Sequence, residues 1–375
     1  MSADSDEDRT LIGAPVVDDH SPPPAAMIHL LVLDQPGAPP HRVPLGPEPL
    51  TIGRTVQNGL MLASDEISRQ HCVVALQDGV AIVTDMGSTN GCWIGGKRIE
   101  GPTSLPPGSV LRVGPYHLQY LCLPRQEMER NQGLERDLEK AQRYVTALLP
   151  APIAEGPVRA DWRFVPSAQI GGDGFGWRFL DDRRFAVWLL DVAGHGAGAA
   201  LLAASVMNTL RSGGPAGADP ADPAAVLAGL NALFQSDRQG GLYFSCWHGV
   251  ADLTARTLCF AGAGHHPGWL LAPGAPAWAA LHVRNPGIGL TAEWPYRSAV
   301  VPLPPASRLV LFSNGAFDTA AADGTRRGLA DFLPHLATPP VPGLPEAERL
   351  LNAVMQSVAP HGLDDDVSIL SLDFD

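Results

Sequence analysis

Apolar and polar positions follow three different patterns along the chain. Residues 27–123 contain short apolar runs separated by Gly, Pro and Asp, for example 28–33, 72–76, 80–84, 110–113 and 116–122. Runs of this length and spacing predict an all-β sandwich, which we place at 26–124. The preceding residues, 1–25, are acidic and then proline-rich, and this composition indicates a disordered tail.

Residues 125–150 carry the second pattern, in which apolar residues recur three and four positions apart among charged ones. This period predicts an amphipathic helical linker that ends at Pro150 and Pro152. Its apolar stripe consists of Leu134, Leu138, Ala141, Val145 and Leu148. The stripe either packs on the chain's own domain or joins two copies into a homodimer, and it is too short to indicate a coiled coil.

Residues 151–375 mix strand and helix patterns. Helices are predicted at 197–211, 222–237 and 345–358, and strands at 162–168, 185–190, 243–252, 257–263, 269–271 and 308–313. Most of these strands follow one another through hairpins, while the helices are grouped. The order therefore predicts an α+β sandwich rather than a Rossmann-like sheet.

Composition narrows the class of protein. The 375 residues are 45% hydrophobic, which suggests at least two domains with cores, and the net charge of −13 shows no bias towards nucleic acid or anionic membrane. The chain shows no apolar run of membrane-spanning length and no signal peptide. Its five cysteines are scattered, so neither a zinc site nor a disulfide framework is indicated. We expect a cytoplasmic protein.

Three loops of the predicted sandwich carry polar residues suited to a phosphorylated peptide. Arg54 offers a planar fork of donors, Ser68 a hydroxyl group, and Asn90 an amide that can hold a peptide backbone. Each loop alone is a weak signal, because Asn-Gly is first of all a turn sequence.

Together, Gly-Arg at 53–54, Ser-Arg-Gln-His at 68–71 and Ser-Thr-Asn-Gly at 88–91 resemble the motifs of a forkhead-associated (FHA) domain, in the same order. The resemblance implies binding to a phosphothreonine-containing protein. Arg54 and Ser68 would hold the phosphate with help from Arg69, Asn90 would hold the peptide main chain, and His71 would brace the loops. The alternative is a sandwich that has lost its ligand.

Asp191 stands where a buried apolar run meets a glycine-rich turn and an Ala- and Leu-rich helix. A carboxylate held rigidly at a sheet edge is a ligand that hard divalent cations prefer. The alternative is that Asp191 only caps the helix.

Six motifs then resemble, in order, the SpoIIE-type branch of the metal-dependent PPM protein phosphatases. They are Gly-Gly-Asp at 171–173, Asp-Val-Ala-Gly-His-Gly at 191–196, Ala-Gly-His at 263–265, Gly-Ile-Gly-Leu at 287–290, Ser-Asn-Gly at 313–315 and Asp-Asp-Asp-Val-Ser at 364–368. The resemblance covers 150–375 and also Leu-Leu-Pro at 148–150, the end of the linker, and we place the domain itself at 151–375. It implies two packed β-sheets flanked by helices, and hydrolysis of phosphoserine or phosphothreonine by water at a site of two Mn²⁺ or Mg²⁺ ions.

The same resemblance implies the ligands. Asp191 would bridge the two metals, the Val192 carbonyl would add a ligand, and Asp173 would reach one metal. Asp365 would close the site, with Asp366 as the weaker candidate.

Histidines offer further candidates. His195 lies near Asp191 and is the best histidine for a general acid, although a histidine at a helix start is more often a turn residue. The neighbours His265 and His266 are expected on a strand, where adjacent side chains point to opposite faces, so His265 is interpreted as structural.

Two positions depart from the family pattern. Asn314 stands where the family has an Asp ligand, and it keeps an oxygen but loses a charge, which weakens metal binding. The chain also has Gly176 near where the family usually has another Asp. The site is therefore expected to hold one metal well and the other poorly.

Two functions remain open. The first is a signalling phosphatase that an FHA module docks on phosphoproteins, with an anti-anti-sigma (STAS) protein as a natural substrate by family resemblance. The second is a pseudophosphatase, silenced by Asn314, that works as a phosphothreonine-dependent adaptor.

Overall fold

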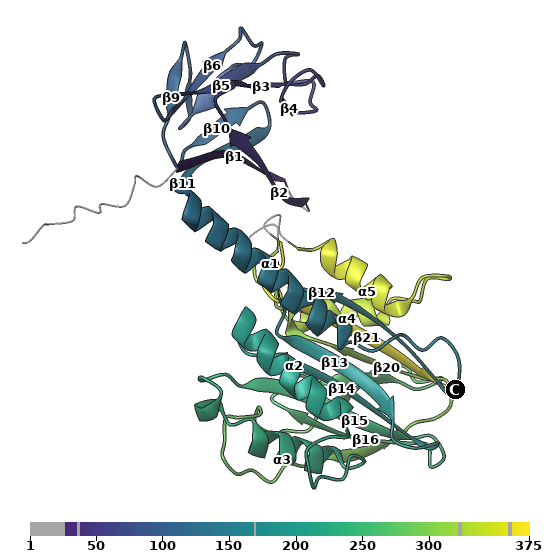
Figure 1. Ribbon diagram of the computed structural model, residues 1–375. Helices are drawn as coiled ribbons and strands as arrows, with labels where there is room; N and C mark the ends of the chain where they lie inside the picture. Colours follow the sequence, from purple (N-terminus) through teal and green to yellow (C-terminus); the bar gives the residue numbers. More distant parts are fainter. Residues whose placement is uncertain (1–26, 36–37, 169, 322–324, 359–361) are drawn as a thin grey trace, which may run out of the picture. The chain divides into compact units, whose positions relative to one another are not determined.

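The computed structural model describes residues 27–35, 38–168, 170–321, 325–358 and 362–375. The tail predicted at 1–25 lies outside the described residues. The chain divides into two compact units, Met1–Gly133 and Leu134–Asp375, and Figure 1 shows the first as β-rich and the second as mixed. The predicted fold class, an all-β sandwich followed by an α+β sandwich, is confirmed.

The first unit contains two antiparallel sheets that enclose one core. One sheet has the order β2-β1-β11-β10-β7-β8 and the other has the order β4-β3-β5-β6-β9, in which only the short β3–β4 pair is parallel among the described strands. The strands are β1 Met27–Gln35, β2 Ala38–Leu45, β3 Leu50–Gly53, β4 Leu60–Met61, β5 Cys72–Gln77, β6 Val80–Asp85, β7 Cys92–Ile94, β8 Lys97–Arg98, β9 Thr103–Leu105, β10 Val110–Val113 and β11 Tyr116–Pro124. Inward residues of both sheets, such as Leu31, Ile52 and Val83, are fully buried.

Helix α1 (Arg125–Ala147) continues directly from β11. Its apolar stripe meets the second unit: Val145 and Leu148 are buried there, and Leu138 and Ala141 pack against the same core. Leu134, in contrast, is 59% exposed. The interpretation as a helix packed on its own domain therefore describes most of the stripe, and a homodimer through this helix stays a prediction.

The second unit contains two five-stranded sheets. The orders are β13-β14-β15-β16-β19 and β12-β21-β20-β17-β18, and their paired strands are antiparallel. The strands are β12 Val158–Val165, β13 Asp173–Phe179, β14 Arg184–Val192, β15 Phe244–Asp252, β16 Thr257–Ala263, β17 Gly268–Leu271, β18 Ala279–Leu281, β19 Ala299–Pro302, β20 Ser307–Phe312 and β21 Val367–Phe374.

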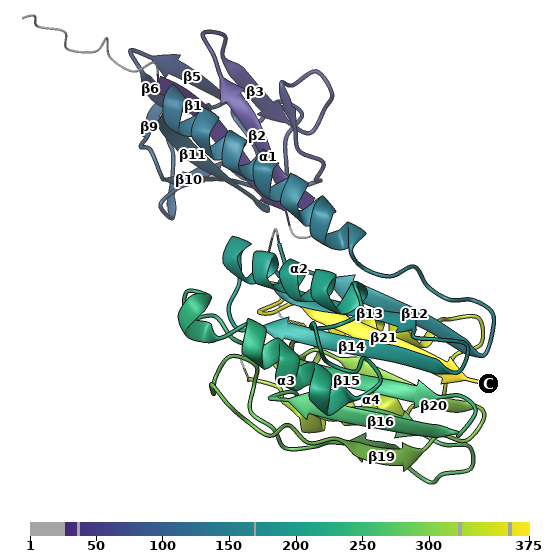
Figure 2. The ribbon, with the colours of Figure 1, turned by 60° about the horizontal axis from the view of Figure 1, so that its bottom comes forward.

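Helices cover the outer faces of these sheets. The helices are α2 Ala197–Arg211, α3 Pro223–Leu233, α4 Leu329–Ala337 and α5 Glu346–Met355, with short 3-10 turns η1 Ser236–Arg238 and η2 Asn314–Ala316. Figure 2 shows α2 and α3 lying over the β13–β16 sheet, and α4 and α5 pack on the β20–β21 side. The result is a four-layer arrangement whose middle core lies between the sheets and contains Phe175, Leu189 and Leu370. None of the helices in the described residues has both the length and the apolar content needed to cross a bilayer.

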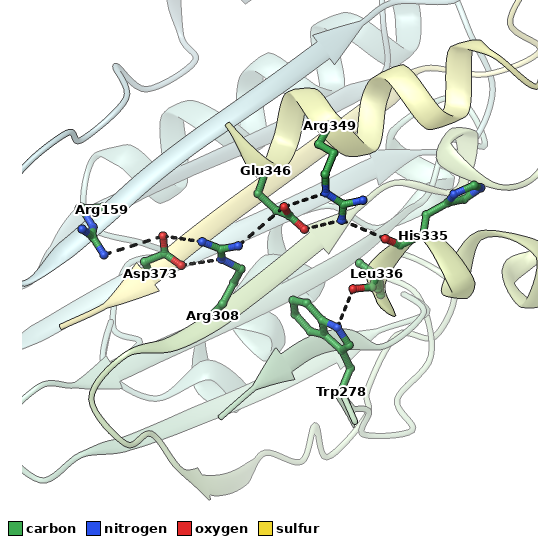
Figure 3. A network of polar contacts seen from close by, with 8 residues as sticks. All are labelled: Arg159, Trp278, Arg308, His335, Leu336, Glu346, Arg349 and Asp373. Atoms are coloured by element: carbon green, nitrogen blue, oxygen red, sulfur yellow. Dashed lines mark hydrogen bonds and ion pairs between the residues drawn. The ribbon is translucent and has the colours of Figure 1, made fainter. Parts of the chain in front are cut away.

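A chain of ion pairs fixes α5 to the outer face of its sheet (Figure 3). The Arg349 guanidinium donates to both carboxylate oxygens of Glu346, at 2.9 and 2.6 Å, and also to the His335 carbonyl at 2.9 Å. Arg308 lies 3.7 Å from Glu346 and forms a bidentate pair with Asp373 on β21. Because Glu346 and Arg349 are both buried, each depends on the other for its charge compensation.

The buried pair predicts an asymmetric response to mutation. We expect Arg349→Leu to lower the free energy of unfolding by about 3 kcal/mol, because Glu346 is left buried without its main partner. The double variant Glu346→Leu/Arg349→Leu should lose less than Arg349→Leu alone. Urea denaturation of both variants measures the difference.

A matched control is a partly exposed ion pair between β12 and the same helix. Arg163 pairs with Glu348 at 2.6 Å but both side chains are at least 30% exposed, so Arg163→Leu should cost about 1 kcal/mol or less. Equal losses for Arg349→Leu and Arg163→Leu would contradict the role given to burial.

Candidate functional site

The carboxylates of Asp173 and Asp191 lie between the two sheets of the second unit. Asp173 begins β13 and is the cross-strand partner of Asp191, near the end of β14. Side chains two positions apart share a face of a strand, and Phe175 and Leu189 belong to the core between the sheets. Both carboxylates therefore point into that gap at its open edge.

The second sheet contributes oxygen-bearing side chains to the same edge. Asn314 follows β20 and Asp365 precedes β21, and the Asn314 Nδ2 donates to Asp365 Oδ2 at 3.2 Å. Across the gap, the buried Ser368 hydroxyl on β21 donates to Asp173 Oδ2 at 2.7 Å. The predicted ligands Asp173, Asp191, Asn314 and Asp365 thus come together from four strand ends.

Asp366 forms hydrogen bonds with several segments at this edge. The sequence did not indicate this role. Its side chain is 4% exposed and accepts hydrogen bonds from the backbone N–H of Gly172 at 2.6 Å and of Ser167 at 2.7 Å. Its own N–H donates to Asp365 Oδ1 at 2.8 Å. Asp366 therefore holds the loop before Asp173 and orients Asp365.

Burial and mutual repulsion make the charged forms of these carboxyls costly. Burial, with the charges of Asp191 and Asp366, raises the pKa of Asp173 well above its ordinary range. Burial, with the charges of Asp365 and Asp366, raises the pKa of Asp191 to about 7. The pKa of Asp365 is also raised, mainly by burial and further by the charge of Asp366, although the hydrogen bond from the Asp366 N–H lowers it. A cation at this edge would relieve all three costs.

The donor set fits a hard divalent cation. The Asn314 Oδ1 is buried and has no hydrogen-bond partner among the described residues. Gly172 lies against the Val192 carbonyl oxygen, which a Cβ at position 172 would approach to 3.2 Å. Carboxylate, amide and carbonyl oxygens are the ligands that Mg²⁺ and Mn²⁺ prefer.

His195 lies in the turn between β14 and α2 and is exposed. Flanking Gly194 and Gly196 have φ angles of 95° and 89°, which explains the glycines of this turn. None of the hydrogen bonds described among the carboxylates involves His195, so its catalytic role stays a prediction.

The expectation for the neighbouring histidines was wrong. His265 and His266 lie in the turn after β16 rather than on a strand, and their ring centroids are only 4.3 Å apart. The His266 ring also stacks on Phe312 at 4.7 Å, immediately before the turn that carries Asn314. Both histidines therefore belong to the same edge of the sandwich.

The environment of Gly176 explains one departure from the family pattern. A Cβ at this position would lie 2.5 Å from the Trp188 ring, on the face of β13 that packs beneath α2. Position 176 therefore points away from the gap that holds Asp173.

The candidate phosphopeptide residues of the first unit also lie together. The Arg54 N–H donates to the Ser68 carbonyl at 3.1 Å, and the Thr89 N–H donates to the Ser68 hydroxyl at 3.2 Å. Asn90 donates through Nδ2 to the Glu66 carbonyl at 2.8 Å, which joins the second and third loops. Arg69 lies exposed in the same loop as Ser68.

A buried residue that the sequence did not single out supports these loops. Asn58 Nδ2 donates to the carbonyls of Thr55 and Arg69, at 2.9 and 2.7 Å. A Cβ at Gly53 would collide with the Arg69 carbonyl, so glycine is required beside Arg54.

A possible metal-binding cluster lies beneath these loops. It contains one potential ligand atom each from His71, Asp85 and Cys92, all within 4.8 Å of one another. Each polar side chain already has backbone partners. His71 accepts from the Ser68 N–H at 3.1 Å and its other ring nitrogen lies 3.3 Å from the Gly91 carbonyl, while Asp85 accepts from the Cys92 N–H at 3.0 Å. The cluster therefore serves to brace the loops.

Comparisons with known proteins agree with both sites. The family model described as stage II sporulation protein E (SpoIIE) matches residues 181–375, more than half of the chain. The chain belongs to the SpoIIE family. The FHA domain model matches residues 50–114, so the first unit is an FHA domain. The SpoIIE match begins after Asp173, which lies on the strand just before it.

Individual relatives are similar to one unit or the other. Phosphoserine phosphatase RsbP of Bacillus subtilis is 27% identical over 63% of this chain and 57% of RsbP. The FHA domain-containing protein FhaB of Mycolicibacterium smegmatis is 32% identical over 20% of this chain and 47% of FhaB. The chain thus spans about half the length of the curated relatives it matches.

A solved structure is similar to the second unit. The SiaA-PP2C domain of Pseudomonas aeruginosa covers 66% of this chain and 99% of that domain, with a TM-score of 0.57 and 25% identity. The SpoIIE domain therefore has the PP2C-like fold of the PPM phosphatases.

The raised pKa of Asp191 predicts how the metal-free SpoIIE domain responds to pH. The unfolded chain ionises this carboxyl near pH 4 and the folded one near pH 7, so stability should fall as pH rises from 4 to 7. Asp191→Asn should be more stable than wild type at pH 7.5, by up to about 4 kcal/mol for a shift of about three pKa units. Denaturation in EDTA at pH 5 and 7.5 measures this difference.

Asp237→Asn serves as the control, because Asp237 is an exposed carboxyl on η1. This variant should follow the wild type at both pH values. If Asp191→Asn shows the same pH dependence as wild type, the carboxyl is not the group whose ionisation costs stability.

Proposed function

We propose that the chain is a metal-dependent protein serine/threonine phosphatase whose FHA domain docks it on phosphothreonine-containing partners. The observation that carries the proposal is the convergence of Asp173, Asp191 and Asp365 at one edge of the sheets. The Asn314 oxygen at the same edge has no hydrogen-bond partner in the described part of the chain. The raised pKa values of the three carboxyls support the proposal, because burial and then mutual repulsion make the charged carboxylates costly, and bound cations would remove that cost.

The proposed roles follow from the positions of the donors. Asp191 would bridge two Mn²⁺ or Mg²⁺ ions, with the Val192 carbonyl, Asp173 and Asp365 completing the set. When bound, the two cations would screen the anionic phosphate and acidify the attacking water. The protein's own contribution is orientation, since Ser368 holds Asp173 and the Asp366 N–H holds Asp365.

A phosphoserine- or phosphothreonine-containing protein is the proposed substrate. RsbP, the relative similar to the SpoIIE domain, is named a phosphoserine phosphatase. A phosphorylated STAS-domain protein is the substrate class that the family resemblance suggests.

A second candidate function rests on Asn314. Its amide donates to Asp365 at 3.2 Å, where a carboxylate would repel Asp365 unless a cation lay between them. The Asp365 carboxylate therefore has a hydrogen-bond partner in Asn314 that does not depend on a metal. The alternative function is a pseudophosphatase that acts as a phosphothreonine-dependent adaptor.

Asn314→Asp distinguishes the two functions. We expect wild type to bind Mn²⁺ weakly, at millimolar concentration, and to hydrolyse phosphopeptides slowly. Asn314→Asp should bind Mn²⁺ at least tenfold more tightly and turn over faster, because it restores a charged ligand. Without metal it should be less stable than wild type at pH 7.5, since it places a second carboxylate beside Asp365.

Calorimetry with Mn²⁺, hydrolysis of a phosphoserine peptide and metal-free denaturation are the three measurements. Asp173→Asn is the control, because it removes a charge from the opposite sheet and should abolish turnover in either background. If neither wild type nor Asn314→Asp hydrolyses the peptide, the adaptor function is favoured. Full wild-type activity at micromolar Mn²⁺ would contradict the assignment of Asn314 as a metal ligand.

The FHA domain generates a separate prediction. Phosphothreonine peptides should bind the full chain more tightly than phosphoserine or unphosphorylated ones, and Arg54→Ala should weaken that binding at least tenfold by removing the guanidinium fork. Fluorescence anisotropy of labelled peptides measures both effects. Lys97→Ala removes an equal charge from the exposed β8 strand and should change little. Equal affinity of wild type for all three peptides would refute the docking role.

A further inference from the structure

A cavity of about 620 Å³ lies at the edge of the SpoIIE domain that carries the carboxylates. Its walls come from the turn after β16 and from residues that follow β18. Antiparallel pairing places these segments at the edge where β14 ends with Asp191. At that edge β16 ends and β17 begins, and β18 ends opposite Gly268, the first residue of β17. The cavity and the acidic cluster therefore face the same solvent.

Strand pairing gives the spacing between the two. Asp191 on β14 pairs with Ser245 on β15, and the next residue, Cys246, pairs with Ala263 at the end of β16. Two strand spacings separate β14 from β16, which is about 10 Å. An extended peptide covers that distance in about three residues.

The inner wall of the cavity is uncharged. The Nδ1 atoms of His265 and His266 lie 2.8 and 3.1 Å from the carbonyls of His266 and Pro267, respectively. Burial lowers the pKa of His265 to about 4 and lowers the pKa of His266 as well, so both rings are neutral near pH 7. The wall therefore offers no charge of its own.

Among the described residues that line the cavity, Arg284 alone has a fixed charge. It is exposed, and among the described residues no ion pair or hydrogen bond holds its guanidinium. His282, also exposed, and Trp294, which is 45% exposed, line the same cavity. Glu293 precedes Trp294 in the chain but does not line the cavity. An exposed arginine that has no ion-pair partner among the described residues is complementary to an anion.

The loop that carries Arg284 is held in place by the next residue. Asn285 donates through Nδ2 to the carbonyls of Gly262 at 2.9 Å and Arg297 at 3.0 Å, and its Oδ1 accepts from the Arg297 N–H at 3.0 Å. The Asn285 carbonyl accepts from the Gly264 N–H at 3.0 Å. The backbone beside Arg284 is thus fixed relative to the end of β16.

We propose that this cavity is a substrate subsite, in which Arg284 binds an acidic side chain of the phosphoprotein about three residues from the phosphorylated one. Trp294 would pack on the aliphatic part of that segment, and His282 would form the opposite wall. The inference rests on the proposed phosphatase function and adds to it the class of sequence that the enzyme selects.

Binding without turnover is the first test. The probes are peptides with a non-hydrolysable phosphonate analogue of phosphoserine and either Asp or Ala three residues before or after it. The protein is the full chain with Arg54→Ala, so that the FHA site is silent, in the presence of Mn²⁺. We expect an Asp peptide to bind about fivefold more tightly than its Ala counterpart. Arg284→Gln should abolish this preference, while Arg183→Gln, an exposed arginine in the hairpin at the other end of β14, should keep it.

Hydrolysis separates this inference from the proposed function. An aryl phosphate is too small to reach the cavity, so Arg284→Gln should hydrolyse it as wild type does and lose only the fivefold advantage in kcat/KM for the Asp phosphopeptide. Two results would refute the subsite but not the phosphatase function, provided that the aryl phosphate is hydrolysed. In the first, wild type shows no preference for the Asp peptide, and in the second, Arg284→Gln shows the same preference as wild type. Absence of aryl phosphate turnover would refute the phosphatase instead, and the binding comparison would still decide whether Arg284 selects acidic peptides.

Discussion

The edge of the SpoIIE domain depends on the buried carboxylate of Asp366. Both of its oxygens accept backbone N–H groups from the loop between β12 and β13, while its own backbone contacts Asp365 and the Ser313 hydroxyl. One side chain thereby satisfies donors of a loop that lies almost two hundred residues away in the sequence. Without these hydrogen bonds, the N–H groups of the buried Gly172 and the partly buried Ser167 would have no partner, and an unpaired N–H group away from water is costly.

Under the proposed function, the two domains bind phosphate through opposite chemistry. The FHA loops present a guanidinium and a hydroxyl that is itself held by backbone hydrogen bonds, and these groups would bind an anion directly. The SpoIIE edge presents buried carboxyl groups with raised pKa values, which would bind an anion only through cations. A phosphorylated side chain of a partner would therefore be retained by the FHA domain without metal and would bind to the SpoIIE edge only with metal.

Much of the fold could be predicted from sequence because local signals agreed. The helix predicted at 197–211 is α2 with the same bounds, and the strand predicted at 257–263 is β16, since their apolar periods are undisturbed. Helix α4 was missed: it has only nine residues and contains Pro334, which normally signals a helix end. Asp191 was predicted as a carboxylate at a strand end, whereas Asp173 and Asp365 were predicted from the family resemblance. The bonds of Asp366 were not, because they join backbone groups that are remote in sequence.

In one case the sequence led to a wrong expectation, and in another it left two alternatives open. His265 and His266 were expected on a strand, where alternation would separate them, but β16 ends two residues earlier and the turn brings the rings together. The stripe of α1 is compatible with either of two partners, and the period of a helix does not identify which apolar surface covers it. In the structure, α2 and the core beneath it cover Val145 and Leu148.

The hydrogen bond between Asn314 and Asp365 has a consequence for the proposed metal site. Two facing carboxylates repel each other unless a cation lies between them, so their separation depends on the cation. The Asn314 amide instead donates to Asp365 at 3.2 Å, so the two side chains attract each other directly. Binding and release of an ion beside Asn314 would then need little rearrangement of the chain, and its occupancy would follow the free ion concentration.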